Sequence, residues 1–220
     1  MTFAAPARGG ARRFLNAGSG FRTRAPTAPF DATDWMETTV DVDPATEPDV
    51  VCSLVDMRAA LPDGSFDAVL SSHSLEHLYG FEVVEALREF RRVLRPDGFA
   101  LVTCPDLDAV AAAVSRHGLG HVAYVAPAGP ITLHDMIFGH SRSIQDGVTA
   151  MAHRTGFTAR SLGEVALEAG FPEVAVGPGN AYDLWGVFGM PETDHAGLAA
   201  LLARTSAAGL WAPTTAGDGR

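Results

Sequence analysis

One stretch of the chain, residues 66–103, constrains the fold more than any other part. It opens with a short apolar run at 68–70, which follows a Pro-Asp-Gly-Ser turn at 62–65. Apolar residues then recur at spacings of four, three and four with charged residues between them, at Val83, Leu87, Phe90 and Leu94. This spacing predicts an amphipathic helix that ends at the Pro-Asp-Gly of 96–98, before another apolar run at 99–103. Strand, helix and strand in this order form a parallel crossover unit, so the chain is predicted to build an α/β sheet.

The sequence of the same stretch resembles that of a known family. Residues 66–78 read Phe-Asp-Ala-Val-Leu-Ser-Ser-His-Ser-Leu-Glu-His-Leu, and 92–98 read Arg-Val-Leu-Arg-Pro-Asp-Gly. Both phrases resemble the fourth and fifth strands of class I S-adenosylmethionine-dependent methyltransferases, in particular a small bacterial subgroup of the type 11 kind. Asp97 replaces the first glycine of the family's turn, but Gly98 remains. The resemblance, over residues 12–190, implies a single Rossmann-like, seven-stranded, mostly parallel sheet with helices on both faces and an antiparallel last strand.

The first predicted strand, 12–17, ends in a glycine-containing turn. Gly18 and Gly20 match two glycines that let the family's backbone approach the cofactor, whereas Asn16 stands where an acidic residue is common. A β-branched strand follows at 38–43 and ends in two acids, about twenty residues beyond the turn, where such folds contact ribose hydroxyls. We expect Asp41 rather than Asp43 to accept hydrogen bonds from the ribose, because it aligns with the family's acid.

The third predicted strand, 49–55, adds the adenine side of the expected site. By resemblance, Asp56 binds the adenine amino group and Met57 packs on the ring, although Asp56 alone is equally explained as a turn cap. Ser72 and His73 follow the strand at 66–71 and complete the expected S-adenosyl-L-methionine site. The segment before residue 38 shows no helical pattern, so the usual first helix is expected to be short or missing.

Two other enzyme classes share parts of these patterns. A dinucleotide site requires a further glycine or alanine where Thr23 stands, and it leaves the two family phrases unexplained. His73 to His77 formally match the His-x-x-Glu-His pattern of zinc peptidases, which needs both imidazoles on one helix face. Here the pattern directly follows a buried strand, so we expect no metal.

Residues 118–157 carry scattered glycines and prolines and many histidines, and they fit neither a simple helix nor a strand. An irregular insertion of this length is more often functional than not, and in the family it covers the substrate. We therefore expect a lid here. The candidates for a catalytic or orienting base are His73 first, followed by His134, His140 and His153 of the lid.

Composition limits the partners. The chain of 220 residues is 47% hydrophobic and carries a formal charge of −10, which disfavours a nucleic-acid backbone as ligand. No stretch resembles a secretory signal or a membrane span. We expect one cytoplasmic methyltransferase domain, residues 1–204, with a flexible tail at 205–220, acting as a monomer or homodimer. It would methylate an oxygen or nitrogen of a small molecule, and the alternatives are an inactive methyltransferase-like domain that works through a partner or, less favoured, an NAD(P)-binding oxidoreductase.

Overall fold

A seven-stranded sheet organises the chain in this computed structural model, which describes residues 10–20, 29–31, 34–126 and 128–211. The strand order is β3-β2-β1-β4-β5-β9-β8, and β9 is antiparallel to both of its neighbours. The remaining strand pairs are parallel, as predicted. The strands of this sheet are β1 Arg12–Ala17, β2 Trp35–Asp41, β3 Val50–Val51, β4 Phe66–Ser72, β5 Leu94–Pro105, β8 Glu173–Pro178 and β9 Asp183–Gly189.

The helix predicted from apolar spacing is present as α1 Gly80–Val93. Three further helices pack on the sheet or at its end: α2 Leu107–His117, α5 Ala159–Glu168 and α6 His195–Leu202. Gly170, with a φ of 94°, follows the end of α5 and takes the left-handed conformation that a glycine adopts readily. The third strand is shorter than expected, and most of the segment expected to lack a helix before residue 38 lies outside the described residues.

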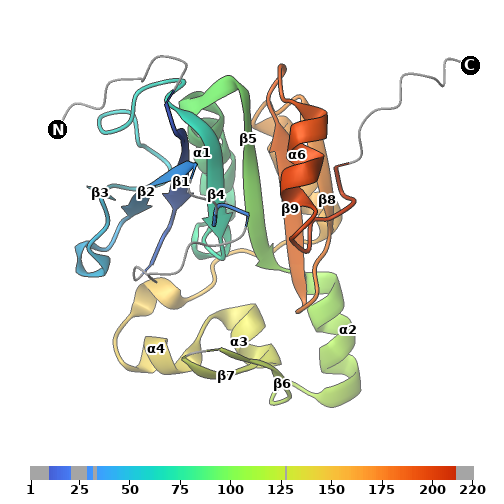
Figure 1. Ribbon diagram of the computed structural model, residues 1–220. Helices are drawn as coiled ribbons and strands as arrows, with labels where there is room; N and C mark the ends of the chain where they lie inside the picture. Colours follow the sequence, from blue (N-terminus) through green and yellow to red (C-terminus); the bar gives the residue numbers. More distant parts are fainter. Residues whose placement is uncertain (1–9, 21–28, 32–33, 127, 212–220) are drawn as a thin grey trace, which may run out of the picture.

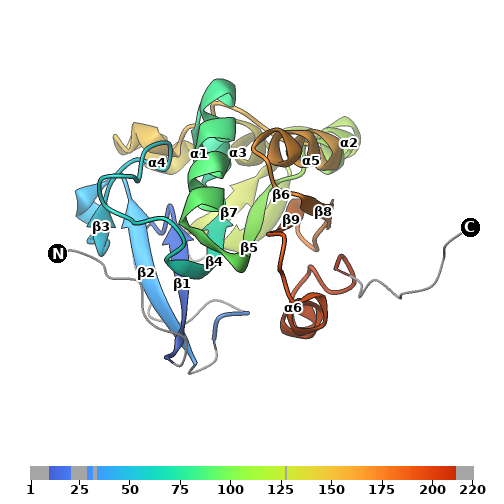
Figure 2. The same ribbon diagram turned by 90° about the horizontal axis from the view of Figure 1, so that it is seen from above.

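Helices cover both faces of the sheet (Figures 1 and 2). On one face α1 and α5 bury apolar side chains such as Phe90 and Leu162 against the strands. On the other face α6 packs with Phe14, Phe30 and Trp35 in a second apolar cluster. The central strands are therefore buried on both faces, which explains why their sequences are continuously apolar.

The insertion at 118–157 is more regular than the sequence suggested. It forms a hairpin of β6 Val122–Ala126 and β7 Gly129–Thr132, then the short helices α3 Leu133–Phe138 and α4 Ser141–Gln145 and the 3-10 turn η3 Thr149–Met151. Buried Leu133 and Met136 of α3 pack against Val110 and Ala113 of α2. Figure 1 shows these elements beyond the end of the sheet where β5 leads into α2.

The prediction of a flexible tail from residue 205 is wrong for its first part. Ala207 is fully buried and Trp211 is 7% exposed, both within the cluster under α6. Turn hydrogen bonds such as Ala208 N to Thr205 O, at 3.1 Å, order this segment. Residues 212–220 lie outside the described ranges.

Every helix in the described part of the chain falls short of the length and apolarity that crossing a membrane requires.

Gly139 offers a test of how the insertion is held together. Its φ is 93°, it pairs with Ala152, and a Cβ there would collide with the carbonyl oxygen of Met151. Gly147 has a similar φ of 97° but open space around it. We expect Gly147→Ala to cost about 1–2 kcal/mol through backbone strain alone, and Gly139→Ala to cost roughly 1–3 kcal/mol more through overpacking.

Urea unfolding followed by circular dichroism measures both changes, and amide hydrogen exchange of residues 133–153 locates them. Equal losses in the two variants would show that the contact between Gly139 and Met151 does not hold the insertion in place.

Candidate active site

The turn after β1 lies against the loop after β4. Gly18, with a φ of 74°, accepts a hydrogen bond at its carbonyl oxygen from Oγ of Ser74, at 3.1 Å. A Cβ on Gly18 would collide with the Ser74 side chain. Glycine is therefore required here so that the two loops can approach each other. Around Gly20, by contrast, a Cβ would meet no atom of the described residues within 4 Å.

Of the two acids after the second strand, Asp41 is the one that faces the glycine turn. Its Oδ2 accepts a hydrogen bond from the backbone N of Gly20 at 2.8 Å, and its Oδ1 accepts one from Asp43 N at 2.9 Å. Asp43 instead caps the 3-10 turn η1, Pro44–Thr46, through Ala45 N. Asn16, in the position of a common acid, donates to Glu37 Oε1 at 2.8 Å.

The two residues expected to contact the adenine, Asp56 and Met57, lie in different surroundings. Asp56 is exposed, and its Oδ1 accepts a long 3.4 Å hydrogen bond from Arg58 N. Met57 is fully buried in the core beneath α1, and its backbone N donates to Oε2 of Glu89 at 2.8 Å. Its side chain therefore faces the core and offers no surface to an adenine ring, so the packing role expected for Met57 is corrected by its burial.

His73 follows β4 directly and has an unusual backbone. Its φ is 51°, a left-handed conformation uncommon for a residue other than glycine, and its N donates to Thr103 O at 2.9 Å. Ser72 is exposed beside it and shares a 3.0 Å hydrogen bond with the hydroxyl of Thr103. Strain of this kind, held in place by neighbouring structure, is often found at functional sites.

The His73 ring is paired with a buried carboxylate. Nδ1 of His73 lies 3.1 Å from Oε1 of Glu76, and the His73 side chain is 42% exposed whereas that of Glu76 is 1% exposed. Burial alone would lower the pKa of His73, but the hydrogen bond and charge of Glu76 outweigh it and raise that pKa. Burial works in the opposite sense on Glu76, and there too the partner dominates, so the pKa of Glu76 is lowered.

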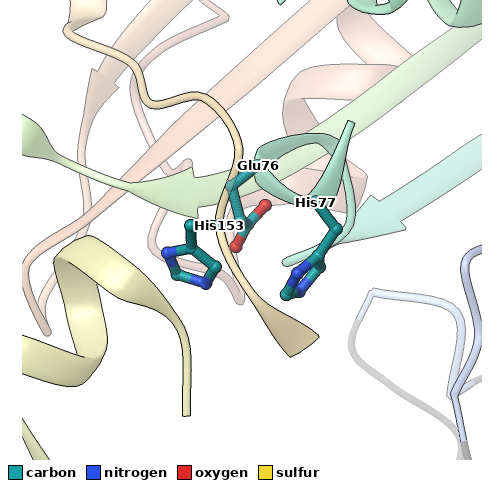
Figure 3. Close-up of side chains that lie close together, drawn as sticks. All are labelled: Glu76, His77 and His153. Atoms are coloured by element: carbon teal, nitrogen blue, oxygen red, sulfur yellow. The ribbon is translucent and has the colours of Figure 1, made fainter. Parts of the chain in front are cut away.

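The segment after η3 lies against this loop, and Figure 3 shows its His153 beside Glu76 and His77. The carbonyl oxygen of Glu76 accepts hydrogen bonds from Arg154 N at 2.8 Å and Thr155 N at 3.2 Å. The rings of His77 and His153 meet edge to face, with centroids 4.9 Å apart. Burial lowers the pKa of His153, although Glu76 opposes the change. The structure therefore brings Glu76 and His153, far apart in sequence, into one cluster.

The other two histidines of the insertion make local contacts. His134 is exposed, its ring lies 4.9 Å from that of Phe138, and its Nδ1 lies 3.3 Å from Ser141 Oγ. His140 precedes α4, and its Nδ1 lies 2.7 Å from Ser143 Oγ. Of the four histidines named from the sequence, His73 and His153 are the two whose surroundings include Glu76.

The residues that match the zinc-peptidase pattern do not form the helix that would place both imidazoles on one face. Residues Leu75–His77 make a single 3-10 turn, η2, and His73 lies before it with its left-handed backbone. His73 and His77 are therefore not one turn apart on a common helix face. No local signal in the sequence indicates that Glu76 and His77 meet His153, because His153 comes from a distant stretch of the chain.

The glycine turn and the loop after β4 lie within the part of the chain that matches a family model. Residues 17–102 match the model described as a methyltransferase domain. No curated protein sequence matches the chain.

Solved structures with the same fold include several methyltransferases. The apo form of the S-adenosylmethionine-dependent methyltransferase SibL has 18% identity and a TM-score of 0.55 over 82% of this chain and 51% of its own. A Thermotoga maritima S-adenosylmethionine-dependent methyltransferase, described as a possible histamine N-methyltransferase, has 15% identity and a TM-score of 0.53 over 80% and 81%. The PH0226 protein from Pyrococcus horikoshii has 13% identity and a TM-score of 0.51 over 81% of each chain.

At these identities the solved structures establish the fold, and the chain spans only about half the length of SibL. Residues 17–102 therefore resemble a methyltransferase domain, and the fold of the chain is that of S-adenosylmethionine-dependent methyltransferases.

Proposed function

We propose that this domain transfers a methyl group from S-adenosylmethionine to an oxygen or nitrogen of a small molecule bound between the loop after β4 and the insertion. The observation that carries the proposal is the pairing of half-exposed His73 with buried Glu76 beside the glycine turn. The insertion supports it, because His153 comes from that segment into the surroundings of the same pair.

The cofactor half of the site is proposed to lie along the ends of β1, β2 and β4. The Asp41 carboxylate accepts two backbone hydrogen bonds, which leaves further lone pairs for the two hydroxyl donors of a ribose. The open space above Gly20 lets a ligand approach the backbone. Asn16, Gly18, Asp56, Ser72 and His73 complete this proposed half.

The acceptor half is proposed to depend on His73 as a base. Because Glu76 only accepts, Nδ1 of His73 carries the proton between them and Nε2 keeps its lone pair. S-adenosylmethionine supplies an electrophilic methyl group on a sulfonium. When the bound cofactor passes its methyl group to the acceptor's lone pair, Nε2 of His73 would take the proton that the acceptor loses. Glu76 holds the ring in the productive tautomer and stabilises the imidazolium.

The nature of the acceptor follows from the charge and the insertion. A net charge of −10 opposes binding of a polyanionic nucleic acid, so a small molecule is the favoured acceptor. His134 and His140 are proposed to orient it from the insertion rather than to take its proton, since their Nδ1 atoms lie beside serine hydroxyls, whereas that of His73 lies beside the carboxylate of Glu76. Their alanine variants should raise KM more than they lower kcat.

The cofactor half is tested by Asp41→Ala. This change should weaken binding of S-adenosylhomocysteine by about 1.5–3 kcal/mol, because charge-assisted hydrogen bonds to the ribose are lost. Asp43→Ala is the matched control and should have a smaller effect. Calorimetric titration measures both, and an equal or larger loss in Asp43→Ala would assign the ribose to Asp43.

The acceptor half is tested by His73→Ala. Turnover, measured as S-adenosylhomocysteine released with an acceptor found among small alcohols and amines, should fall roughly 10²–10⁴-fold. The affinity for S-adenosylhomocysteine should fall far less than turnover. His117→Ala, at an exposed position on α2, serves as the control. Turnover retained in His73→Ala would remove the base from the mechanism, and absence of binding to either cofactor form would reject the enzyme altogether.

A further inference from the structure

Three side chains with metal-binding atoms converge beside His73. Glu76 and His77 come from η2, and His153 comes from the segment after η3 (Figure 3). One ligand atom from each lies within 4.8 Å of the other two. Two imidazoles and one carboxylate form a donor set that zinc and iron(II) use in proteins.

Both histidines are held in the orientation that a metal ligand needs. Nδ1 of His77 lies 3.3 Å from the carbonyl oxygen of Ala152, and Nδ1 of His153 lies 3.2 Å from that of Met136. A carbonyl oxygen only accepts, so each Nδ1 carries the hydrogen and each Nε2 keeps its lone pair. Metal-binding histidines are commonly fixed by this kind of hydrogen bond from the second ring nitrogen to a backbone carbonyl.

Glu76 supplies the second, independent observation. Its side chain is 1% exposed, and Oε1 is engaged by His73. Among the described residues, its Oε2 has no hydrogen-bond partner. A buried, unpaired carboxylate oxygen is costly, and native structures rarely leave one unsatisfied. A cation between Glu76 and the two histidines would satisfy it.

We propose that Glu76, His77 and His153 bind a divalent first-row transition ion of the zinc class. Bonds of about 2.0–2.2 Å to such an ion place its ligands about 3–4 Å apart, so small side-chain rotations close the site. Three protein ligands leave a position open for water or for an oxygen of another molecule. The proposal reverses the sequence-based expectation of no metal, and it stands independently of methyl transfer.

The test is titration of the chelator-treated full chain with ZnCl₂ in a calorimeter, without cofactor, and with CoCl₂ in a spectrophotometer. One equivalent should bind, and Co²⁺ should give visible absorption bands of a low-coordinate site. His77→Ala and His153→Ala should each weaken Zn²⁺ binding at least about tenfold, because even the outer partners of metal ligands are worth about 10–100-fold in affinity. Mg²⁺, which prefers oxygen ligands, should bind much more weakly than Zn²⁺.

The matched control is a double variant, His117→Ala with His121→Ala, because those two rings stack with centroids 4.6 Å apart and offer a rival imidazole pair. It should bind Zn²⁺ like the parent chain. Loss of binding in this control, unchanged binding in His153→Ala, or no binding of either ion would overturn the proposal. His153 is partly exposed and its variant should fold, as circular dichroism can verify, so the test does not depend on replacing buried Glu76. None of these outcomes bears on the cofactor titration, so the two proposals fail separately.

Discussion

The buried carboxylate of Glu76 connects the parts of the site that come from distant stretches of the chain. Its side chain fixes the His73 ring, and its backbone carbonyl accepts hydrogen bonds from Arg154 and Thr155. Removing a charge from water costs several kcal/mol unless partners restore its interactions. The hydrogen bond from His73 and the charges of His73 and His77 outweigh burial and lower the pKa of Glu76, although its Oε2 has no hydrogen-bond partner among the described residues. Glu76 therefore joins the loop after β4 to the end of the insertion.

The sheet topology explains why this loop also meets the glycine turn. In the order β3-β2-β1-β4-β5, the chain runs from β1 through β2 to β3 on one side and from β4 to β5 on the other. The strand order therefore reverses at the boundary between β1 and β4. Ligands of open α/β sheets bind at such a boundary, beyond the carboxyl ends of the strands. Gly18 and Ser74 touch across it, and Asp41 reaches it from β2. The turn proposed to hold the cofactor is thus adjacent to the loop that carries the proposed base.

Local sequence patterns predicted most of this architecture, but they did not predict the contacts between distant segments. The helix α1 and the strands beside it follow from apolar spacing and from the Pro-Asp-Gly stop. The hairpin and short helices of the insertion did not, because α3 and α4 are too short to show a helical period. Met57 was assigned to the adenine ring by resemblance to the family, and a resemblance in sequence does not show which way the side chain points. The meeting of Glu76 with His153 depends on folding of the intervening chain, which no spacing reveals.

The contacts that hold the insertion matter for the proposed ion. Leu133 and Met136 bury apolar surface against α2, Arg154 and Thr155 donate hydrogen bonds to the carbonyl oxygen of Glu76, and buried Phe157 packs in the main core. Buried apolar contacts on both sides of residues 153–155 resist opening more than hydrogen bonds alone would. These contacts hold His153 beside Glu76. Because an ion that needs both ligands binds only the assembled arrangement, it would stabilise that arrangement by mass action.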